Sequence, residues 1–438
     1  MIPAAEYRQR RQRLMELMGP DTMAVVAAAP RCFRSNDVPW PYRQDSDFLY
    51  LTGFREPDAV LVLLPGRRNG EQILFCRPES EDIRLWHGEV TGLEAAVETL
   101  GVDDAYPIED LDDILPGLLE DRHSLYYSLG RHQELDQRLM EWTRRLRLMR
   151  ERRGCTVPEQ FHSLEYLLHE MRLIKSPSER QAVQRAVEAS VDCHLACWRQ
   201  IRHGLDEGLH EKALAGFFHW AAARQGLELA YPPIVAAGRN ACVLHHEPSL
   251  QRLEPGRLLL MDAGVEWDGY AADITRCIPL SGRYDARDRT LLDIVLAARD
   301  AAAATLRPGR RWRDVHLAAV RVITAGLVDL GLLQGEPDGL VEQGAYRPYF
   351  MTRTGHWLGL DVHDAGGYRQ GDRVLEAGMV VALEPGVLIR PEHAGRKRSW
   401  YHRVMRVEDD YLIGPDGACN LSQRLPAQAD AVEAVLQP

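Results

Sequence analysis

LLLMDAGVEWDGYAADITRCIP, residues 258–279, is the segment on which our predicted fold for this chain rests. An Asp-Gly pair between two apolar runs is the strongest short-range signal for a β-hairpin. We therefore place Asp268 and Gly269 in a two-residue turn. This turn pairs Trp267 with Tyr270 and sets the register of both strands.

Two aspartates of this hairpin share a face. Asp262 pairs with Thr275 and Gly264 with Asp273, so the two carboxylates are diagonal neighbours, roughly 7–8 Å apart at the backbone and within reach of a shared ion. Thr275 faces the same side and can hydrogen-bond a ligand oxygen. The alternative is two acids on a solvent-exposed face. Residues 258–261 are apolar on both faces, however, which predicts a buried strand, and a buried carboxylate needs compensation such as a metal ion.

The length and composition describe a two-domain globular protein. The 438 residues exceed what one core usually supports, and we place an N-terminal domain at residues 1–165 and a C-terminal domain at residues 166–438. The net charge of -11 argues against a nucleic-acid or anionic-membrane partner. No apolar run approaches the roughly 18 residues that a bilayer span requires. The first residues lack the apolar core of a signal peptide, and eight scattered cysteines indicate a reducing, cytoplasmic context.

The order of the expected elements indicates an α+β fold. Apolar runs typical of strands occupy residues 22–29, 47–54, 59–65 and 72–76. Helical periodicity follows at residues 92–100, 111–119 and 135–149. The sequence SPSE from Ser176 to Glu179 is a capping box with proline at the first helical position, and it predicts a helix to about Arg202. Further helices are expected at residues 210–225, 285–304 and 312–332, so long helices alternate with paired strands.

Two polar stretches of the N-terminal domain lie outside its expected core. RSNDVPWPYRQ, residues 34–44, fits either a functional loop or an ordinary packed surface loop. The last helix of this domain ends in six arginines between Arg144 and Arg153. Positive charge suits the C-terminal end of a helix, so we expect a solvated face and not a nucleic-acid patch.

Acids and imidazoles recur beside apolar runs in the C-terminal domain. They occupy TGHWLGLDVHD (354–364), VVALEPG (380–386) and VMRVEDD (404–410). A lone buried histidine is usually a satisfied core residue, and a lone glutamate at a strand end is usually exposed. The repetition of the pattern favours a site.

Four motifs of the C-terminal domain together resemble the aminopeptidase P and prolidase family of dinuclear metallopeptidases. They are MDAGVEWDGYAADITR, GHWLGLDVHD, ALEPG and RVED. QDSDFLYLTGF and HEMRLIKSPSE resemble aminopeptidase P in particular, so the resemblance runs over nearly the whole chain. It implies an α+β fold in which a pita-bread metallopeptidase domain follows a smaller α/β N-terminal domain.

The resemblance transfers five metal ligands, namely Asp262, Asp273, His356, Glu384 and Glu408. It implies that Asp262 chelates one ion, that Asp273 and Glu408 bridge, and that His356 and Glu384 hold the other ion. Four carboxylates and one imidazole neutralise two divalent cations, and oxygen-rich ligation suits Mn²⁺. Two ions roughly 3.5–4 Å apart can activate a water and polarise a scissile carbonyl.

Further catalytic roles also follow from the resemblance. His245 and His363 match family histidines that contact substrate and assist proton transfer. Glu384 is the expected proton acceptor from the nucleophilic water, and Arg406 is expected to orient a carboxylate ligand.

Relatives of this kind often form dimers or tetramers in which N-terminal residues of one subunit wall the active site of its neighbour. Asp37 in RSNDVPWPYRQ and Trp86 in RLWHGE match the positions suspected of that role. An acid at the mouth attracts the substrate's α-amino group, and an indole shapes the wall. The alternative is that Trp86 is core of its own domain and Asp37 is an exposed loop acid.

The chain departs from the family pattern around the expected substrate pocket. Thr352 replaces the first histidine of the pattern FMHGLSHW, His402-Arg403-Val404-Met405 replaces a glycine-containing run, and Leu388 replaces a tyrosine. The metal ligands are intact, whereas the pocket for the substrate's proline is altered.

We expect a Mn²⁺-dependent aminopeptidase that removes the residue before an N-terminal X-Pro bond. This tertiary amide lacks an N–H and has a constrained φ, so a dedicated pocket is required. One alternative is a prolidase restricted to X-Pro dipeptides. Another is a catalytically silent pita-bread protein that binds peptides.

Overall fold

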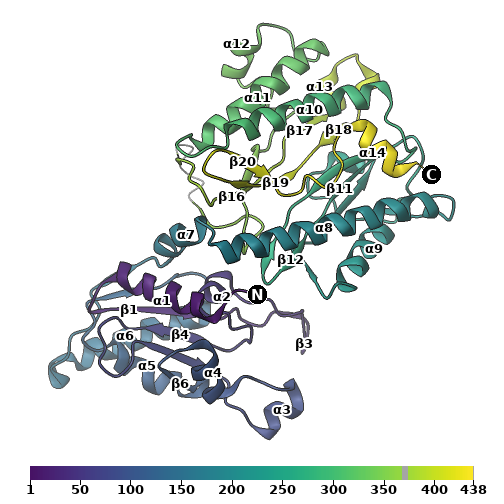
Figure 1. Ribbon diagram of the computed structural model, residues 1–438. Helices are drawn as coiled ribbons and strands as arrows, with labels where there is room; N and C mark the ends of the chain where they lie inside the picture. Colours follow the sequence, from purple (N-terminus) through teal and green to yellow (C-terminus); the bar gives the residue numbers. More distant parts are fainter. Residues whose placement is uncertain (367–372, 438) are drawn as a thin grey trace. The chain divides into compact units, whose positions relative to one another are not determined.

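The structure, a computed structural model, describes residues 1–366 and 373–437, and the chain divides into two units, Met1–Arg172 and Leu173–Pro438 (Figure 1). We predicted the domain boundary between residues 165 and 166. None of the helices in the described residues combines the length and apolarity that a membrane crossing requires.

Within the described residues, the first unit contains a mixed six-stranded sheet in the order β6-β5-β4-β1-β7-β8. Its strands are β1 (Thr22–Ala27), β4 (Val60–Leu63), β5 (Gln72–Cys76), β6 (Asp104–Pro107), β7 (Ser124–Tyr126) and β8 (Gln160–His162), and a separate hairpin comprises β2 (Phe33–Ser35) and β3 (Val38–Pro39). The helices are α1 (Ala4–Met18), α2 (Ser46–Thr52), α3 (Glu81–His87), α4 (Gly92–Leu100), α5 (Leu111–Leu119), α6 (Gln133–Arg153) and α7 (Glu165–Leu173).

Apolar side chains from both faces of this sheet explain the arrangement of the first unit. Strand β1 is buried along its whole length, because helices cover both of its faces. Leu115 of α5 and Trp142 of α6 pack against one face in a common core with Val25 and Val62. Helices α2 and α4 contact β1 and β5 respectively.

The prediction of a strand at residues 47–54 is wrong, because this segment contains helix α2. Asp45 caps the helix by accepting a hydrogen bond from the Phe48 backbone N–H at 2.9 Å. Every residue of α2 is buried, so its apolar side chains point in all directions. A short apolar run of this kind has the same periodicity as a buried strand, and its capping residue is the distinguishing signal.

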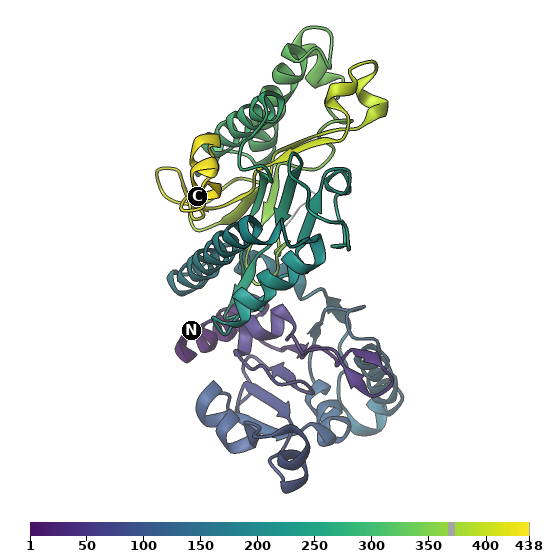
Figure 2. The same ribbon diagram turned by 90° about the vertical axis from the view of Figure 1, so that its right-hand side faces the viewer.

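The second unit has sheets between two pairs of helices, as Figures 1 and 2 show. The helix pairs are α8 (Pro177–Gly204) with α9 (Glu211–Ala223) and α10 (Ala286–Thr305) with α11 (Trp312–Asp329), and the chain also contains α12 (Pro337–Glu342), α13 (Pro391–Ala394) and α14 (Ala429–Leu436). The sheets run β10-β11-β14, β13-β12-β9, β15-β16-β19-β20 and β17-β18.

The strands of the second unit are short and antiparallel to their neighbours. They are β9 (Glu228–Leu229), β10 (Ile234–Ala237), β11 (Leu258–Asp262), β12 (Val265–Trp267), β13 (Tyr270–Ala271), β14 (Thr275–Pro279), β15 (Gly355–Trp357), β16 (Val380–Leu383), β17 (Gly386–Ile389), β18 (Arg403–Arg406), β19 (Asp409–Ile413) and β20 (Ala418–Asn420). The alternation of helices and strands confirms the predicted α+β class.

The hairpin has the predicted register at both ends. Trp267 pairs with Tyr270, and Asp262 pairs with Thr275. Asp268 and Gly269 have φ values of 55° and 85°, which two-residue hairpin turns with positive φ require. Strand β11 is buried and lies between β10 and β14, as the apolar run 258–261 predicted.

The N-terminus of α8 is tied to this hairpin. Ser176 and Glu179 form the predicted capping box, with Pro177 at the first helical position. The Tyr270 hydroxyl donates to the second carboxylate oxygen of Glu179 at 2.9 Å. The same glutamate therefore caps the helix and fixes the hairpin that carries two of the predicted ligands.

Candidate metal centre

Five side chains from separate parts of the second unit converge on one cluster. Asp262 ends β11, Asp273 precedes β14, His356 lies on β15, Glu384 follows β16 and Glu408 precedes β19. Their candidate ligand atoms form overlapping groups, Asp262 with Asp273 and Glu408, and His356 with Glu384 and Glu408. Within each group these atoms lie within 4.8 Å of one another.

His356 faces the acids through one ring nitrogen. Its Nε2 lies 3.3 Å from Oδ2 of Asp273 and 3.6 Å from Oε1 of Glu408. Its Nδ1 lies 3.0 Å from the carbonyl oxygen of Trp357, and a hydrogen bond there leaves Nε2 free to act as a ligand.

Carboxylates in this cluster are crowded and poorly solvated. Burial raises the pKa of Asp262, and burial together with the charge of Glu408 raises the pKa of Glu384 to about 8. Burial and the charge of Asp273 raise the pKa of Asp410 well above its ordinary value. Burial and mutual repulsion therefore oppose full ionisation of these carboxylates. Divalent cations ligated by carboxylate oxygens and one imidazole would favour the ionised forms.

Tyr231 is a member of the cluster that the sequence reasoning missed. Its hydroxyl oxygen lies 2.7 Å from Oδ1 of Asp262 and 2.6 Å from Oδ1 of Asp273. A phenol carries one proton, so it donates to one carboxylate at a time, and the second short contact needs a further proton or a cation. No local motif marks Tyr231, because only the pairing of Ile234 with Asp262 brings the preceding loop to this end of β11.

Arg406 and Thr275 hold the carboxylates from one side. The guanidinium of Arg406 is ion-paired with Asp262, and its Nε donates to Oγ1 of Thr275 at 3.3 Å. The hydroxyl of Thr275 in turn donates to Oε2 of Glu408 at 2.7 Å. Burial opposes the charge on Arg406, but Asp262 and Glu408 together raise its pKa above the ordinary value.

The sequence reasoning also did not identify Asp410 as part of the metal cluster. Its Oδ2 accepts a hydrogen bond from the Asp273 backbone N–H at 3.0 Å. Its Oδ1 is buried and has no hydrogen-bond partner in the part of the chain that the structure describes.

The two histidines predicted to contact substrate are exposed beside this cluster. The ring of His363 lies 4.4 Å from that of His356, centroid to centroid, and it joins Asp273 and His356 in a third group that could hold a metal. Burial and then the charge of His356 lower the pKa of His363, and His245 lowers it further.

Asp37 and Trp86 belong to the first unit, whereas the cluster belongs to the second. Asp37 is exposed in the turn between β2 and β3. The side chain of Trp86, on α3, is 79% exposed. The alternative that Trp86 is core of its own domain is therefore wrong.

All three departures from the family pattern contribute to one hollow beside the cluster. Thr352, Leu388 and, from the third departure, Val404 and Met405 border a cavity of about 30 Å³ that Glu384 and Arg406 also line. These substitutions therefore alter the walls next to the candidate ligands.

Comparison with known proteins extends these observations. Residues 181–415 match Metallopeptidase family M24, and residues 7–126 match the aminopeptidase P N-terminal domain. The Xaa-Pro aminopeptidase of Escherichia coli is 37% identical over 438 residues, which cover 99% of this chain and 98% of that protein.

Solved structures agree over the same extent. Pseudomonas aeruginosa aminopeptidase PepP has a TM-score of 0.95 and 44% identity, covering 99% of this chain and 98% of that one. Escherichia coli aminopeptidase P with the inhibitor Pro-Leu has a TM-score of 0.94 and 37% identity, with coverages of 99% and 98%. The resemblance inferred from the motifs and the pita-bread fold is confirmed. Since fold and sequence agree over almost the entire chain, this protein belongs to metallopeptidase family M24 and carries the aminopeptidase P N-terminal domain.

Proposed function

We propose that this chain is an Xaa-Pro aminopeptidase that holds two Mn²⁺ ions in each subunit. The observation that carries the proposal is the convergence of the five expected ligand residues, in a chain similar along its whole length to an enzyme of that name. The comparisons favour this activity over that of a prolidase.

Each proposed ligand has a defined role. Asp262 would hold one ion, and His356 and Glu384 would hold the other. Asp273 and Glu408 would serve both ions, and each belongs to two of the overlapping groups of candidate ligands. Mn²⁺ is favoured because four of the five ligands offer oxygen atoms.

The bound ions would supply Lewis acidity, which lowers the pKa of a water and polarises the scissile carbonyl. Glu384 accepts the proton of the attacking water. His245 and His363, both exposed beside the cluster, hydrogen-bond the substrate and help to move a proton to the leaving group. Arg406 keeps the Asp262 carboxylate oriented through their ion pair.

Substrate length separates this proposal from the prolidase alternative. Rates are compared for an X-Pro dipeptide and for X-Pro-Xaa peptides, together with metal analysis of the purified protein. The proposal predicts turnover of the longer peptides, which stops on chelation with EDTA and returns with Mn²⁺. Turnover of dipeptides alone would establish a prolidase, and full metal occupancy without turnover would favour the silent peptide-binding alternative.

Ligand substitutions test the assignment of roles. Asp273→Asn and Glu408→Gln are expected to abolish activity with the fold retained by circular dichroism, whereas Glu254→Gln, at an exposed carboxylate, leaves the rate unchanged. His363→Ala is expected to lower turnover with the metal retained. Wild-type rates in either ligand variant would contradict the two-ion site, and metal loss in His363→Ala would make that histidine a ligand.

The proposal includes assembly into a homodimer or homotetramer. The exposed indole of Trp86 and the exposed carboxylate of Asp37 are available to wall a neighbouring subunit's site. Asp37→Ala is expected to raise KM with metal content unchanged, and activity should fall when the oligomer dissociates. A fully active monomer, measured by sedimentation and kinetics at the same concentration, would contradict the shared site.

We also place the enzyme in the cytoplasm. All eight cysteines are free thiols, and Cys193, Cys197 and Cys277 are buried, as expected of a chain that folds in a reducing compartment.

A further inference from the structure

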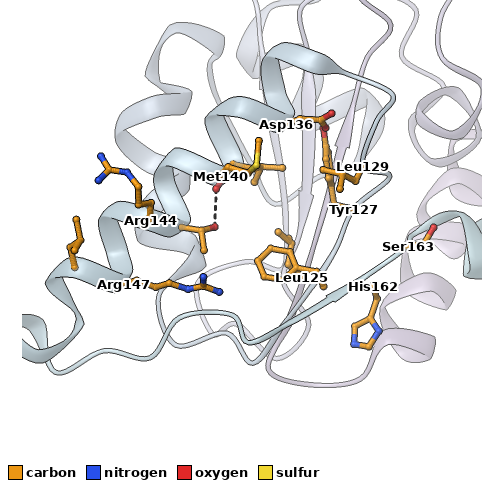
Figure 3. A pocket seen from close by; sticks show the side chains of 13 residues that line it. Leu125, Tyr127, Leu129, Asp136, Met140, Arg144, Arg147, His162 and Ser163 are labelled. Carbon is orange, nitrogen blue, oxygen red and sulfur yellow. Dashed lines mark hydrogen bonds between the residues drawn. The ribbon is translucent and has the colours of Figure 1, made fainter.

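A large cavity in the first unit takes no part in the proposed peptidase chemistry. It has a volume of about 700 Å³ and lies between helix α6 and strands β7 and β8 (Figure 3). This volume falls within the range of binding pockets, roughly 300–1,000 Å³. Its apolar lining includes Leu125, Leu129, Leu139, Met140, Leu148 and Phe161.

Several of these apolar side chains are open to solvent. The exposed fractions are 74% for Leu129, 61% for Met140, 71% for Leu148 and 55% for Phe161. Apolar side chains scattered singly over a surface need no explanation, but four around one hollow form a patch that association would cover.

Strand β8 gives this patch an open backbone edge. It is the last strand of the sheet and pairs in parallel with β7 alone among the described residues. The Gln160 backbone N–H donates to the His123 carbonyl, and the His162 carbonyl accepts from the Tyr127 N–H, so these two residues face β7. Backbone groups alternate in direction along a strand, so the N–H and C=O of Phe161 point to the open edge.

The charged side chains around the cavity differ in whether they have hydrogen-bond or ion-pair partners. Asp136 is fully engaged, since its carboxylate oxygens accept from the Tyr127 hydroxyl at 2.7 Å and the Gly130 N–H at 3.1 Å. Figure 3 shows Arg147 reaching from α6 toward the strands, whereas Arg144 points away and is ion-paired with Glu141.

Arg147 is therefore the cavity's available cation. It lines the cavity and has no ion pair within the described residues. The side chain of Arg153, the last member of the predicted basic cluster, lies outside the described part, so the solvated face remains a prediction there.

We propose that this cavity docks an extended segment of another protein, which adds to the sheet as a strand beside β8. Alternate side chains of an added strand point to the α6 face, about 6.6 Å apart, and apolar ones fill the cavity beside Phe161. An acidic side chain in the segment meets Arg147. The open edge favours a peptide over a compact small molecule, because a second backbone offers the acceptor and donor that match the N–H and C=O of Phe161.

A blocked peptide tests this docking separately from catalysis. The probe is a fluorescein-labelled, N-acetylated peptide in which leucine and glutamate alternate, so an exopeptidase that requires a free amine does not cleave it. Fluorescence anisotropy with the full-length protein should show saturable binding. Arg147→Glu should weaken binding about tenfold, as should Phe161→Ser. Both variants should keep the wild-type peptidase rate, so failure of the peptidase proposal leaves this result intact.

Matched controls distinguish strand addition from nonspecific attraction. Arg150→Glu makes the same charge change on an exposed side chain of α6 that does not line the cavity, and it should have little effect on the Kd. A probe with proline in place of its central leucine lacks a backbone donor and should bind much more weakly.

Four results would overturn the proposal. The first is no binding of the alternating probe, and the second is a Kd that neither Arg147→Glu nor Phe161→Ser changes. The third is binding of the proline probe with the same Kd as the alternating probe, and the fourth is a smaller oligomer for Phe161→Ser in sedimentation. The last result would make this surface an interface between copies of the chain. In the first case, binding of decanoate through Arg147 would identify a small amphipathic anion as the ligand in place of an added strand.

Discussion

Replacement of Arg276 should destabilise the second unit more than any surface arginine does. Arg276 lies on β14 with 2% of its surface exposed, and its guanidinium joins three segments. Its Nη1 donates to the carbonyls of Thr275 at 2.9 Å and Glu408 at 2.7 Å, and its Nη2 donates to Oδ1 of Asp409 at 2.7 Å and the Leu425 carbonyl at 3.0 Å.

The expected magnitude follows from what Arg276→Met leaves behind. Breaking a buried ion pair by removing one partner costs about 3–5 kcal/mol. Asp409 keeps its ion pair with Arg299 at 2.8 Å and still accepts a hydrogen bond from the Ser422 hydroxyl at 2.6 Å, so its charge stays compensated. We therefore expect a loss of unfolding free energy near the lower end of this range, about 3 kcal/mol. Arg276→Lys keeps the charge but not the planar fork, so it should lose roughly half as much.

Urea unfolding of the metal-free protein, followed by circular dichroism, measures this loss without a contribution from bound ions. The control is Arg289→Met, because Arg289 is likewise ion-paired, with Asp430 and Glu433, but is 39% exposed. Its loss should stay below about 1 kcal/mol. Equal losses in Arg276→Met and Arg289→Met would refute the argument that the buried guanidinium holds these segments together.

Two further predictions concern acid stability and the loop that carries His245. Burial lowers the pKa of His194 to about 4 in the folded chain, below its ordinary value of 6.5, so its stabilising contribution is complete above pH 6.5 and is lost as the pH falls toward 4. Between pH 6.5 and 4, urea unfolding of the metal-free protein should show that His194 accounts for about 3 kcal/mol of the fall in the free energy of unfolding. His194→Gln should make the free energy of unfolding depend less steeply on pH. An unchanged dependence would assign the acid sensitivity to other groups. Glu211 is fully buried, accepts a hydrogen bond from the Ser249 hydroxyl at 2.6 Å and lies 2.8 Å from Nε2 of His246, next to His245 in the chain. Glu211→Gln should therefore raise KM more than it lowers kcat, with the metal retained. Unaltered kinetics would show that Glu211 does not position His245.

Features that depend on a few neighbouring residues could be predicted from the chain alone. The turn at Asp268 and Gly269 set the hairpin register, because only a short set of backbone conformations joins two antiparallel strands with two residues. The capping box at Ser176 began α8 for the same local reason. The resemblance of the motifs then identified the family, because acids and imidazoles recur in a fixed order.

Other features depend on which distant segments become neighbours in the folded chain. Tyr231 reaches two carboxylates because β10 pairs with β11, and Arg276 meets Glu408 because β14 lies beside the segment before β19. The apolar run at residues 47–54 contains a helix that is buried on every side, so its apolar pattern alone did not distinguish it from a buried strand. The cavity beside Phe161 lies between α6 and the last strand of the sheet, β8, and no periodicity within either segment encodes that placement. Such features arise from contacts between residues far apart in the chain, and local backbone preference carries no information about them.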